Sequence, residues 1–316
     1  MPDFNPIVVR RMLFLRQCAM FAAADLDELA TIAENVVGMT YPAGTIVAPA
    51  NRRLTALRFI VDGRIETNDR RWEARDAFGA IEIAAARELS SNAVATLPTE
   101  AFELSAVDFA DVLEDNFGVL VSVLRHLANQ MLELGSTSLR RPRPLPAIRN
   151  LGLVERLLVL RQVLPFTRTR VQALVRLAHD SEEVHLPIGT VLHEDEPATG
   201  GFVIIEGSVR TSDPASPVLG PGDSLGYLET LAGRPPHRRW TTGTGVRALR
   251  TSGAAFLDVL EDHSDIGLAL IAAFSTALLD RNARFALVPA NDASNAGSSL
   301  ERLDVTLAQG LLRTRS

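Results

Sequence analysis

The chain repeats itself, and this repeat limits its possible folds more than any other feature of the sequence. Residues 109–116 (FADVLEDN) are nearly restated at residues 256–263 (FLDVLEDH), an offset of 147. Four further pairs of segments match in the same order, with offsets of 144 to 147; they are 11–21 with 156–166, 41–47 with 186–192, 59–65 with 203–209, and 78–82 with 225–229. Collinear matches with small drifts are typical of a duplicated unit whose loops have changed length. The sequence therefore predicts two copies of one domain.

Each copy has the same internal pattern. A helical segment comes first, with Leu26, Leu29, Ile32 and Ala33 at helical spacing in the first copy. Short apolar runs separated by Gly and Pro follow, such as VVGMTYPAGTIV, RFIVDGRIE, AVATL and AFELSA. Several short strands with regular turn signals favour a sandwich or roll over a parallel α/β sheet. The predicted class is mainly β with flanking helices (α+β): two tandem jelly-roll-like β-rolls.

Helices are expected to close each copy. Asp108 and Ser252 are the predicted N-caps of short helices that carry the repeated DVLED. A longer helix with one apolar stripe then ends each copy; the stripes are Leu120, Val121, Leu124, Leu127, Met131 and Leu134, and Ile266, Leu270, Ile271, Phe274 and Leu278. The first domain is therefore assigned to residues 1–134 and the second to residues 151–288.

A linker is predicted at residues 135–150, because Pro142, Pro144 and Pro146 forbid a continuous helix there. Its three arginines, Arg140, Arg141 and Arg143, could meet an acidic partner or nucleic acid. A solvated linker is the favoured interpretation, because the cluster is small and the chain is acidic.

The predicted tail, residues 289–316, starts polar and then regains a helical pattern. Ser298 and Glu301 have the spacing of a capping box. One face of this short amphipathic helix would carry Leu300, Leu303, Leu307 and Leu311, which we expect to contact a partner.

Charge and cysteine content limit the cellular setting. The formal net charge of −6 gives no electrostatic reason to bind nucleic acid or an anionic membrane. Cys18 is the only cysteine and stands among apolar residues, which indicates a buried thiol and a reducing compartment. The most hydrophobic stretch, residues 266–279, is too short to cross a bilayer. We expect a cytoplasmic protein without membrane insertion.

Each copy resembles a cyclic-nucleotide-binding domain, the β-roll of catabolite-activator-type regulators and of protein kinase A regulatory subunits. In the second copy the resemblance rests on FVIIEGSVR, LGPGDSLGYLETLAG and FLDVLEDH, and in the first on YPAGTIV, FIVDGRIE and FGAIEIA. The resemblance implies that a Gly-rich turn and a short helix present backbone N–H groups to a cyclic phosphate. It also implies a Glu after the turn glycine for the ribose, an Arg about nine residues later for the phosphate, and a terminal helix that moves on binding.

The first copy departs from the family pattern where that chemistry is located. Gly79 matches the turn glycine, but Ala80 stands at the Glu position, and Leu89 or Ser90 stands at the Arg position. A buried phosphate without a cation costs several kcal/mol, on the order of the penalty for an unpaired buried charge. The first copy is therefore not expected to bind a cyclic nucleotide in the family's way.

The second copy departs at the same two positions. Gly226 matches the turn glycine, Tyr227 replaces the Glu, and Pro236 or His237 falls at the Arg position. Arg238 could substitute for the missing Arg, with Glu229 nearby, so Gly226, Glu229 and Arg238 form a candidate ligand site. The favoured alternative makes Arg234, Arg238 and Arg239 surface charges. The adjacent Trp240 is expected in the core instead of stacking on a base.

No catalytic or metal constellation is found. The six His residues show no metal-ligand spacing with Cys or with one another, and the sequence has no P-loop and no G-x-S-x-G. About 30 residues follow the last helix, too few for a helix-turn-helix, so direct DNA binding is not expected.

Three functional hypotheses follow. The first is a non-enzymatic regulatory or adaptor protein with two degenerate rolls and no cofactor, acting through a protein partner or a homodimer formed by its terminal helices. The second is a second-messenger sensor that binds a cyclic nucleotide or another anion in the second domain. The third, a narrower form of the first, is an assembly scaffold that docks through its tail.

Overall fold

The computed structural model describes residues 5–134, 150–163, 166, 171–192, 200–211, 218–235 and 239–280. The predicted linker, apart from Asn150, and the predicted tail helix with Leu300, Leu303, Leu307 and Leu311 lie outside these residues. Below, the first copy means the described residues up to 134, and the second copy means those from 150 onward.

The first copy forms a β-roll with helices at both ends of its sequence. Its helices are α1 (Pro6–Leu15), η1 (Ala19–Phe21), η2 (Asp27–Leu29), α2 (Ala30–Asn35), α3 (Ala80–Ala84), α4 (Ala106–Asp115) and α5 (Phe117–Glu133). Its strands are β1 (Val37–Tyr41), β2 (Ile46–Ala48), β3 (Ala56–Asp62), β4 (Ile65–Glu66), β5 (Arg71–Trp72), β6 (Ala77–Phe78), β7 (Ala93–Ala95) and β8 (Thr99–Ser105).

These strands make two antiparallel sheets, with orders β1-β8-β3-β6 and β2-β7-β4-β5. A core inside the roll draws side chains from both sheets, including Ile60 and Phe78 from one and Ile65 and Trp72 from the other. The rings of Trp72 and Phe78 meet edge to face with centroids 5.0 Å apart. Short strands with alternating buried residues thus produce the predicted roll.

The second copy repeats this architecture. Its helices are α6 (Leu153–Leu160), α7 (Val171–His179), α8 (Tyr227–Ala232), α9 (Gly253–Asp262) and α10 (Ser264–Leu279). Its strands are β9 (Ser181–Leu186), β10 (Val191–Leu192), β11 (Gly200–Glu206), β12 (Val209–Thr211), β13 (Ser224–Leu225), β14 (Trp240–Thr242) and β15 (Val246–Ser252). They pair in the orders β13-β11-β15-β9 and β10-β14-β12. Trp240 is buried inside this roll, as expected. The predicted α+β class with β-rolls and flanking helices is confirmed.

The turn between the third and fourth strands is built alike in both copies. In the first copy Gly63 adopts a φ of +91°, and a Cβ there would lie 2.3 Å from the carbonyl oxygen of Pro98. The next backbone N–H, that of Arg64, donates to Thr99 Oγ1 at 3.0 Å. In the second copy the N–H of Ser208 donates to Thr244 Oγ1 at 2.9 Å. A shared hydrogen bond at matched positions supports a common origin of the two rolls.

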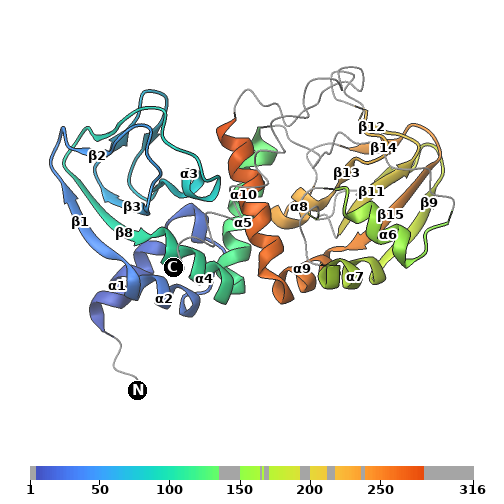
Figure 1. The fold of residues 1–316 in the computed structure, drawn as a ribbon, viewed down its shortest axis with the longest axis horizontal. Helices are drawn as coiled ribbons and strands as arrows, with labels where there is room; N and C mark the ends of the chain where they lie inside the picture. Colours follow the sequence, from blue (N-terminus) through green and yellow to red (C-terminus); the bar gives the residue numbers. More distant parts are fainter. Residues whose placement is uncertain are drawn as a thin grey trace.

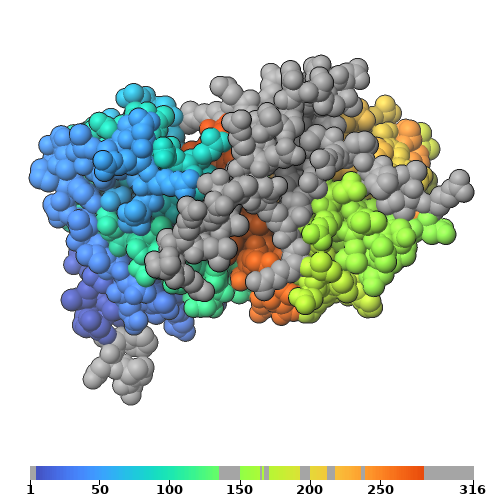
Figure 2. Space-filling view, in the orientation of Figure 1, coloured from blue at the N-terminus to red at the C-terminus, as the bar shows by residue number. Residues whose placement is uncertain are grey.

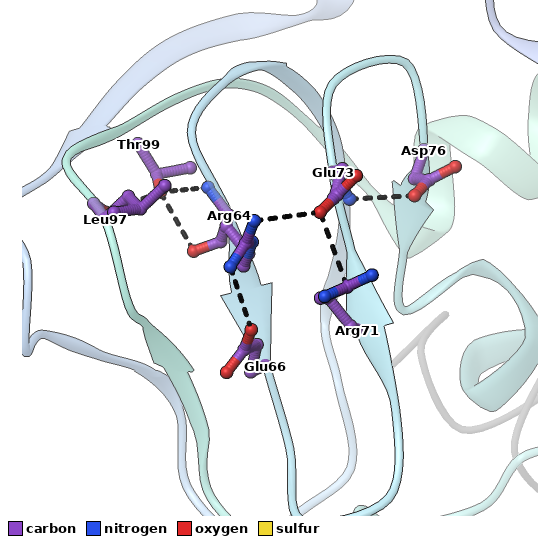
Figure 3. A network of polar contacts seen from close by, with 7 residues as sticks. All are labelled: Arg64, Glu66, Arg71, Glu73, Asp76, Leu97 and Thr99. Atoms are coloured by element: carbon purple, nitrogen blue, oxygen red, sulfur yellow. Dashed lines mark hydrogen bonds and ion pairs between the residues drawn. The ribbon is translucent and has the colours of Figure 1, made fainter.

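Around the turn of the first copy, charged side chains extend this arrangement (Figure 3). The Arg64 guanidinium is paired with Glu66 at 3.5 Å and with Glu73 at 3.0 Å, and Arg71 also contacts Glu73 at 3.4 Å. The backbone N–H of Glu73 donates to the Asp76 carboxylate at 2.8 Å. These partly exposed pairs join the β4–β5 hairpin to the turn, and each pair contributes little stability on its own.

The predicted caps are right in one copy and wrong in the other. Ser252 caps α9, its side chain accepting from the Ala255 N–H at 3.1 Å. In the first copy the cap of α4 is Ser105, and Asp108, the predicted cap, supplies the N–H that Ser105 accepts at 3.0 Å. Asp108 also accepts the Ser105 hydroxyl proton at 2.6 Å. Both residue types can cap, and the helix simply begins one turn earlier than expected.

The two long helices α5 and α10 bring the copies together. They lie against each other between the two rolls (Figure 1), and α10 is visible between the copies in the space-filling view (Figure 2). Each also packs on the short helix of the other copy, α5 on α8 and α10 on α3. One continuous apolar core includes buried residues of both copies. The arrangement is therefore reciprocal, as in a dimer formed within a single chain.

Leu120 and Gly267 meet where these helices touch. They occupy equivalent positions in the repeat, yet a Cβ on Gly267 would lie only 2.6 Å from Leu120 Cδ2. A large residue on one helix thus fits the small residue on the other. The predicted stripe of α5 differs slightly from expectation, because Leu134 is exposed whereas Val119, Val123 and Ala128 are buried. No helix of the described residues has the length and apolarity to cross a membrane.

Replacing Gly267 by Leu should destabilise the protein. The added side chain would overlap Leu120, and overpacking of this kind costs about 1–3 kcal/mol in the free energy of unfolding. Leu120→Ala in the same chain should recover part of the loss, which urea unfolding would measure. Gly245→Leu is the matched control, since a Cβ there meets nothing within 4 Å. Equal losses from both Gly→Leu variants would contradict the close approach.

Two residues of the first copy adopt backbone conformations for which the second copy uses glycine. Arg75 has a φ of +77° where the second copy has Gly222 at +88°, and Ala86 has +52° where it has Gly233 at +66°. Left-handed backbone costs a non-Gly residue about 1–2 kcal/mol. Arg75→Gly and Ala86→Gly should each raise the unfolding free energy by about 1 kcal/mol, measured by chemical denaturation. Arg75→Ala is the control and should bring no such gain.

Candidate functional site

In each copy a glycine and a short helix follow directly after a two-residue strand, β6 in the first copy and β13 in the second, where the family resemblance locates its phosphate-binding turn. Gly79 precedes α3 and Gly226 precedes α8, both with a φ of +88°. Only glycine adopts this left-handed conformation without strain, so the sequence match reflects a shared backbone. Both helices are short, five and six residues, so the N–H groups of the first turn make up most of each helix.

Tyr227, which stands at the family's Glu position, is buried among the helices of the second copy. Its hydroxyl donates to Thr251 Oγ1 at 3.1 Å, and its ring lies edge to face with Phe256, centroids 5.1 Å apart. A Cβ on Gly201 would come within 2.4 Å of that ring. Burial raises the pKa of Tyr227 to about 12, although the bond to Thr251 lowers it. The side chain is thus committed to the core.

At the two positions equivalent to Gly201 and Tyr227, the first copy has the large and the small residue exchanged. Leu57 matches Gly201, and Ala80 matches Tyr227; both are buried. The large residue is on the strand in one copy and on the helix in the other. In neither copy does this position offer a carboxylate to a ribose.

A glutamate lies three residues after the turn glycine in each copy. The sequence analysis named the one in the second copy and missed the one in the first. Glu82 in α3 and Glu229 in α8 are equivalent in the repeat, and each is only 3% exposed. The Glu82 carboxylate is paired with the Arg70 guanidinium, which comes from the turn between β4 and β5. The glutamate that ends both FGAIE and LGYLE was the sequence signal that could have identified Glu82. No sequence signal indicated that Arg70 would be its partner.

Glu229 has a different environment. Burial raises its pKa to about 7, while the backbone N–H groups of Glu229 and Gly226 and the charge of Arg234 lower it. Its carboxylate therefore lies over the first turn of its own helix and accepts the amides there. In the described part of the chain, one oxygen of Glu82 and one of Glu229 have no hydrogen-bond partner.

This arrangement changes what the turn can bind. In each copy a buried carboxyl group occupies the first turn of the short helix, where the resemblance implies a phosphate. In the first copy the Glu82 charge is already paired with Arg70. In the second copy an ionised Glu229 would repel a phosphate at short range, and the low-dielectric surroundings strengthen that repulsion. An anion could enter only if the carboxyl group moved away or carried a proton.

The other predicted ligand residues are not gathered here. Arg238, Pro236 and His237 lie outside the described residues. Leu89 is buried in the core of the first roll, where it fills space between the sheets. The guanidinium of Arg234 instead donates to the backbone oxygen of Asn129 at 3.4 Å, in the first copy. The candidate site of Gly226, Glu229 and Arg238 therefore stays a prediction.

Each short helix is held from outside by the long helix of the other copy. After α3, Arg87 Nη2 contacts both carboxylate oxygens of Asp280, at 2.9 and 3.0 Å. At the end of α8, Asn129 Nδ2 donates to the Ala232 oxygen at 3.5 Å, alongside the Arg234 contact. These polar contacts are partly exposed and add little free energy, but they align each pair of helices.

Other chemistry is sparse in the described ranges. No group of His, Cys, Asp and Glu there could hold a metal ion. Cys18 is buried, and burial raises the pKa of its thiol to about 12, so the thiolate is disfavoured. The expected structural role of this cysteine agrees with that environment.

No protein-family model matches the chain, and no curated protein matches its sequence. Among solved structures, it is similar to the regulatory domain of Toxoplasma gondii PKA with cAMP (13% identity, TM-score 0.33, covering 85% of this chain and 97% of that one). It is also similar to the regulatory subunit of a cAMP-independent protein kinase A from Trypanosoma brucei (15% identity, TM-score 0.34, covering 88% and 98%). A cyclic nucleotide-binding-like protein from Brucella abortus matches over 34% of this chain and 98% of its own (22% identity, TM-score 0.30).

By their names, these neighbours are PKA regulatory or cyclic nucleotide-binding-like proteins, which agrees with the predicted resemblance. At these identities and TM-scores the likeness concerns the fold and decides nothing about ligand or partner.

Replacing Glu229 by Gln should change how stability depends on pH. Because burial raises the pKa of Glu229 from 4.5 to about 7, the folded state binds this proton more tightly than the unfolded state does. The resulting stabilisation is present below pH 4.5 and is lost as the pH rises to about 7. Glu229→Gln should therefore be more stable than wild type above pH 7, by up to roughly 3 kcal/mol, with the advantage vanishing near pH 4.5.

Urea unfolding of both proteins between pH 5 and pH 8 would measure this difference. Glu82→Gln is the matched control: it removes the charge that is paired with Arg70, so it should destabilise the protein at pH 8. A Glu229→Gln variant that is less stable than wild type at pH 8 would contradict the cost of the buried charge.

Proposed function

We propose that this protein is a non-enzymatic regulatory adaptor whose two nucleotide-type cradles are closed by its own glutamates and which acts through protein contacts. The observation that carries the proposal is the pair of buried carboxyl groups, Glu82 and Glu229, in the first turn of both short helices. The Glu at the ribose position is replaced in both copies. A cyclic nucleotide would thus lack its usual acceptor in both copies, meet the Arg70-paired carboxylate of Glu82 in the first copy, and meet the carboxyl group of Glu229 in the second.

The packing between the copies supports the same proposal. In the family that the chain resembles, a terminal helix moves when ligand binds. Here α5 and α10 are packed on each other and on the short helices α8 and α3. Moving either helix would expose apolar residues of the shared core, so a rigid platform is favoured over a ligand-driven hinge.

The proposed partner is another protein. The apolar faces of α5 and α10 are buried against each other within the chain. They are therefore not exposed to form a homodimer. Partner contacts would then involve other surfaces. A scaffold that docks through the tail is the narrower form of this proposal, and its test is deletion of residues 298–316 followed by a comparison of captured partners.

A second-messenger sensor is the rival function, and the retained left-handed Gly226 is the observation in its favour. In that case the pocket of the second copy would take a cyclic nucleotide as effector, with Arg238 as its cation. Binding of an anion above neutral pH would have to be accompanied by proton uptake at Glu229, because the ionised carboxylate repels the ligand. The raised pKa of Glu229, about 7, makes this protonation inexpensive near neutral pH.

A thermal-shift panel separates the two functions. The full chain is heated with cyclic AMP, cyclic GMP and cyclic dinucleotides at millimolar concentration, at pH 6 and pH 8. We expect no shift, because a bound ligand at 100 times its dissociation constant would add about 2.7 kcal/mol to stability and be plainly visible. A shift that Arg238→Ala abolishes would refute the adaptor proposal and establish the sensor.

A further inference from the structure

The strand β1 of the first copy lies at the edge of its sheet and is unusually free of protection. It bonds to β8 on one side only, and its first four residues are exposed. Val37 is 59% exposed and Met39 is 37% exposed. The strand contains neither a charged residue nor a proline. No backbone hydrogen bond in the described part of the chain uses the outer side of residues 37–40.

The second copy treats the equivalent edge in the opposite way. Strand β9 occupies the same place in its sheet and carries Glu182, Glu183 and His185. Glu182 is paired with Arg250 at 2.9 Å, and Glu183 with Arg247 at 2.5 Å. Charges on an edge strand are a common means of preventing further strands from adding. The two copies share one fold, so the bare edge of β1 is a difference in sequence and not a requirement of the roll.

We propose that β1 is a docking strand to which an extended segment of a partner protein adds as the next strand of the sheet. A row of outward N–H and C=O groups can be satisfied only by another extended backbone. The partner's side chains would alternate between the two faces of the sheet. On one face they would lie beside Val37 and Met39, whose exposed side chains select apolar residues.

The other face sets the charge of the partner. Thr40 pairs with Glu100 on β8, and Glu100 pairs with Asp62 on β3, so these three residues form one row across the sheet. All three are exposed. A basic residue in the added strand opposite Thr40 would extend towards these acidic groups. An antiparallel segment should therefore have the order basic, apolar, any residue, apolar.

This inference deepens the proposed adaptor function by naming one of its contact surfaces. Strand β1 contains no residue of either cradle. If no peptide binds, the proposal that the cradles are closed is unaffected. If a nucleotide binds to the second copy, the proposal that β1 is a docking strand is unaffected. The two experiments therefore fail independently.

The test uses the full chain and a set of fluorescent twelve-residue peptides with the basic–apolar–any–apolar order. Each peptide has two proline partners, one with proline at the free position and one with proline at the residue before it. Alternate N–H groups of a strand face its neighbour, so one of the two prolines must remove a donor that faces β1. Fluorescence anisotropy should show binding by the first set and at least roughly tenfold weaker binding by one of the two proline partners. Hydrogen exchange should slow at Val37–Tyr41 when peptide is present.

Three variants make the outcome specific. Met39→Lys and Val37→Lys place a charge on the edge and should each weaken binding by roughly tenfold. Ile188→Lys adds the same charge at a side chain that is 71% exposed, outside the strand, and should bind like wild type. Glu100→Lys should weaken binding of the basic peptides and favour versions with Glu at that place.

Thermal unfolding of every variant checks that it folds. Because Val37 and Met39 are substituted separately, the test still decides if one of the two variants does not fold. Peptides that bind no better than either proline partner would overturn the inference. Undiminished binding by both lysine variants would also overturn it. Self-association of the wild-type chain that Met39→Lys abolishes would assign the edge to a second copy and likewise refute a peptide partner.

Discussion

The contact between α5 and α10 is the interaction on which the rest of the molecule depends. Each roll by itself ends in a long apolar helix that its own sheet does not cover. Pairing these helices within the chain joins the helical layers of both copies into one core. The gain comes from removing aliphatic side chains from water, at about 25 cal/mol per Å² of apolar surface. The stability of either copy is therefore tied to the presence of the other.

The two copies have diverged by complementary changes. Leu120 faces Gly267, and the Leu57–Ala80 positions of the first copy become Gly201 and Tyr227 in the second. In each case a large side chain in one copy corresponds to a small one in the other, and the neighbouring position compensates for the difference. Packed interiors tolerate such substitutions best, because the total side-chain volume is kept. A symmetric dimer of one copy would bring Leu120 against another Leu120. The asymmetry therefore favours pairing within the chain over pairing between chains.

Much of this fold could be predicted from the sequence, because the repeat, the strand punctuation and the turn glycines are local signals. Gly79 and Gly226 stood out since their backbone excludes most other residues. The pairing of Glu82 with Arg70 could not be foreseen, because the two residues are twelve positions apart and the intervening strands decide which arginine is near. The cap of α4 was misassigned because Ser105 and Asp108 are both good caps, and only the starting point of the helix separates them.

The proposed closure of the cradles depends on the helix pairing. In the second copy the short helix α8 is covered by α5, and its first turn holds Glu229. Clearing that turn for a phosphate would require Glu229 to leave its own helix amides, and its departure would disturb a helix that a second domain clamps. Ligand binding would then have to supply both the cost of an unpaired buried charge and the cost of loosening a shared core. These two costs are the physical reason for proposing a rigid adaptor in place of a sensor.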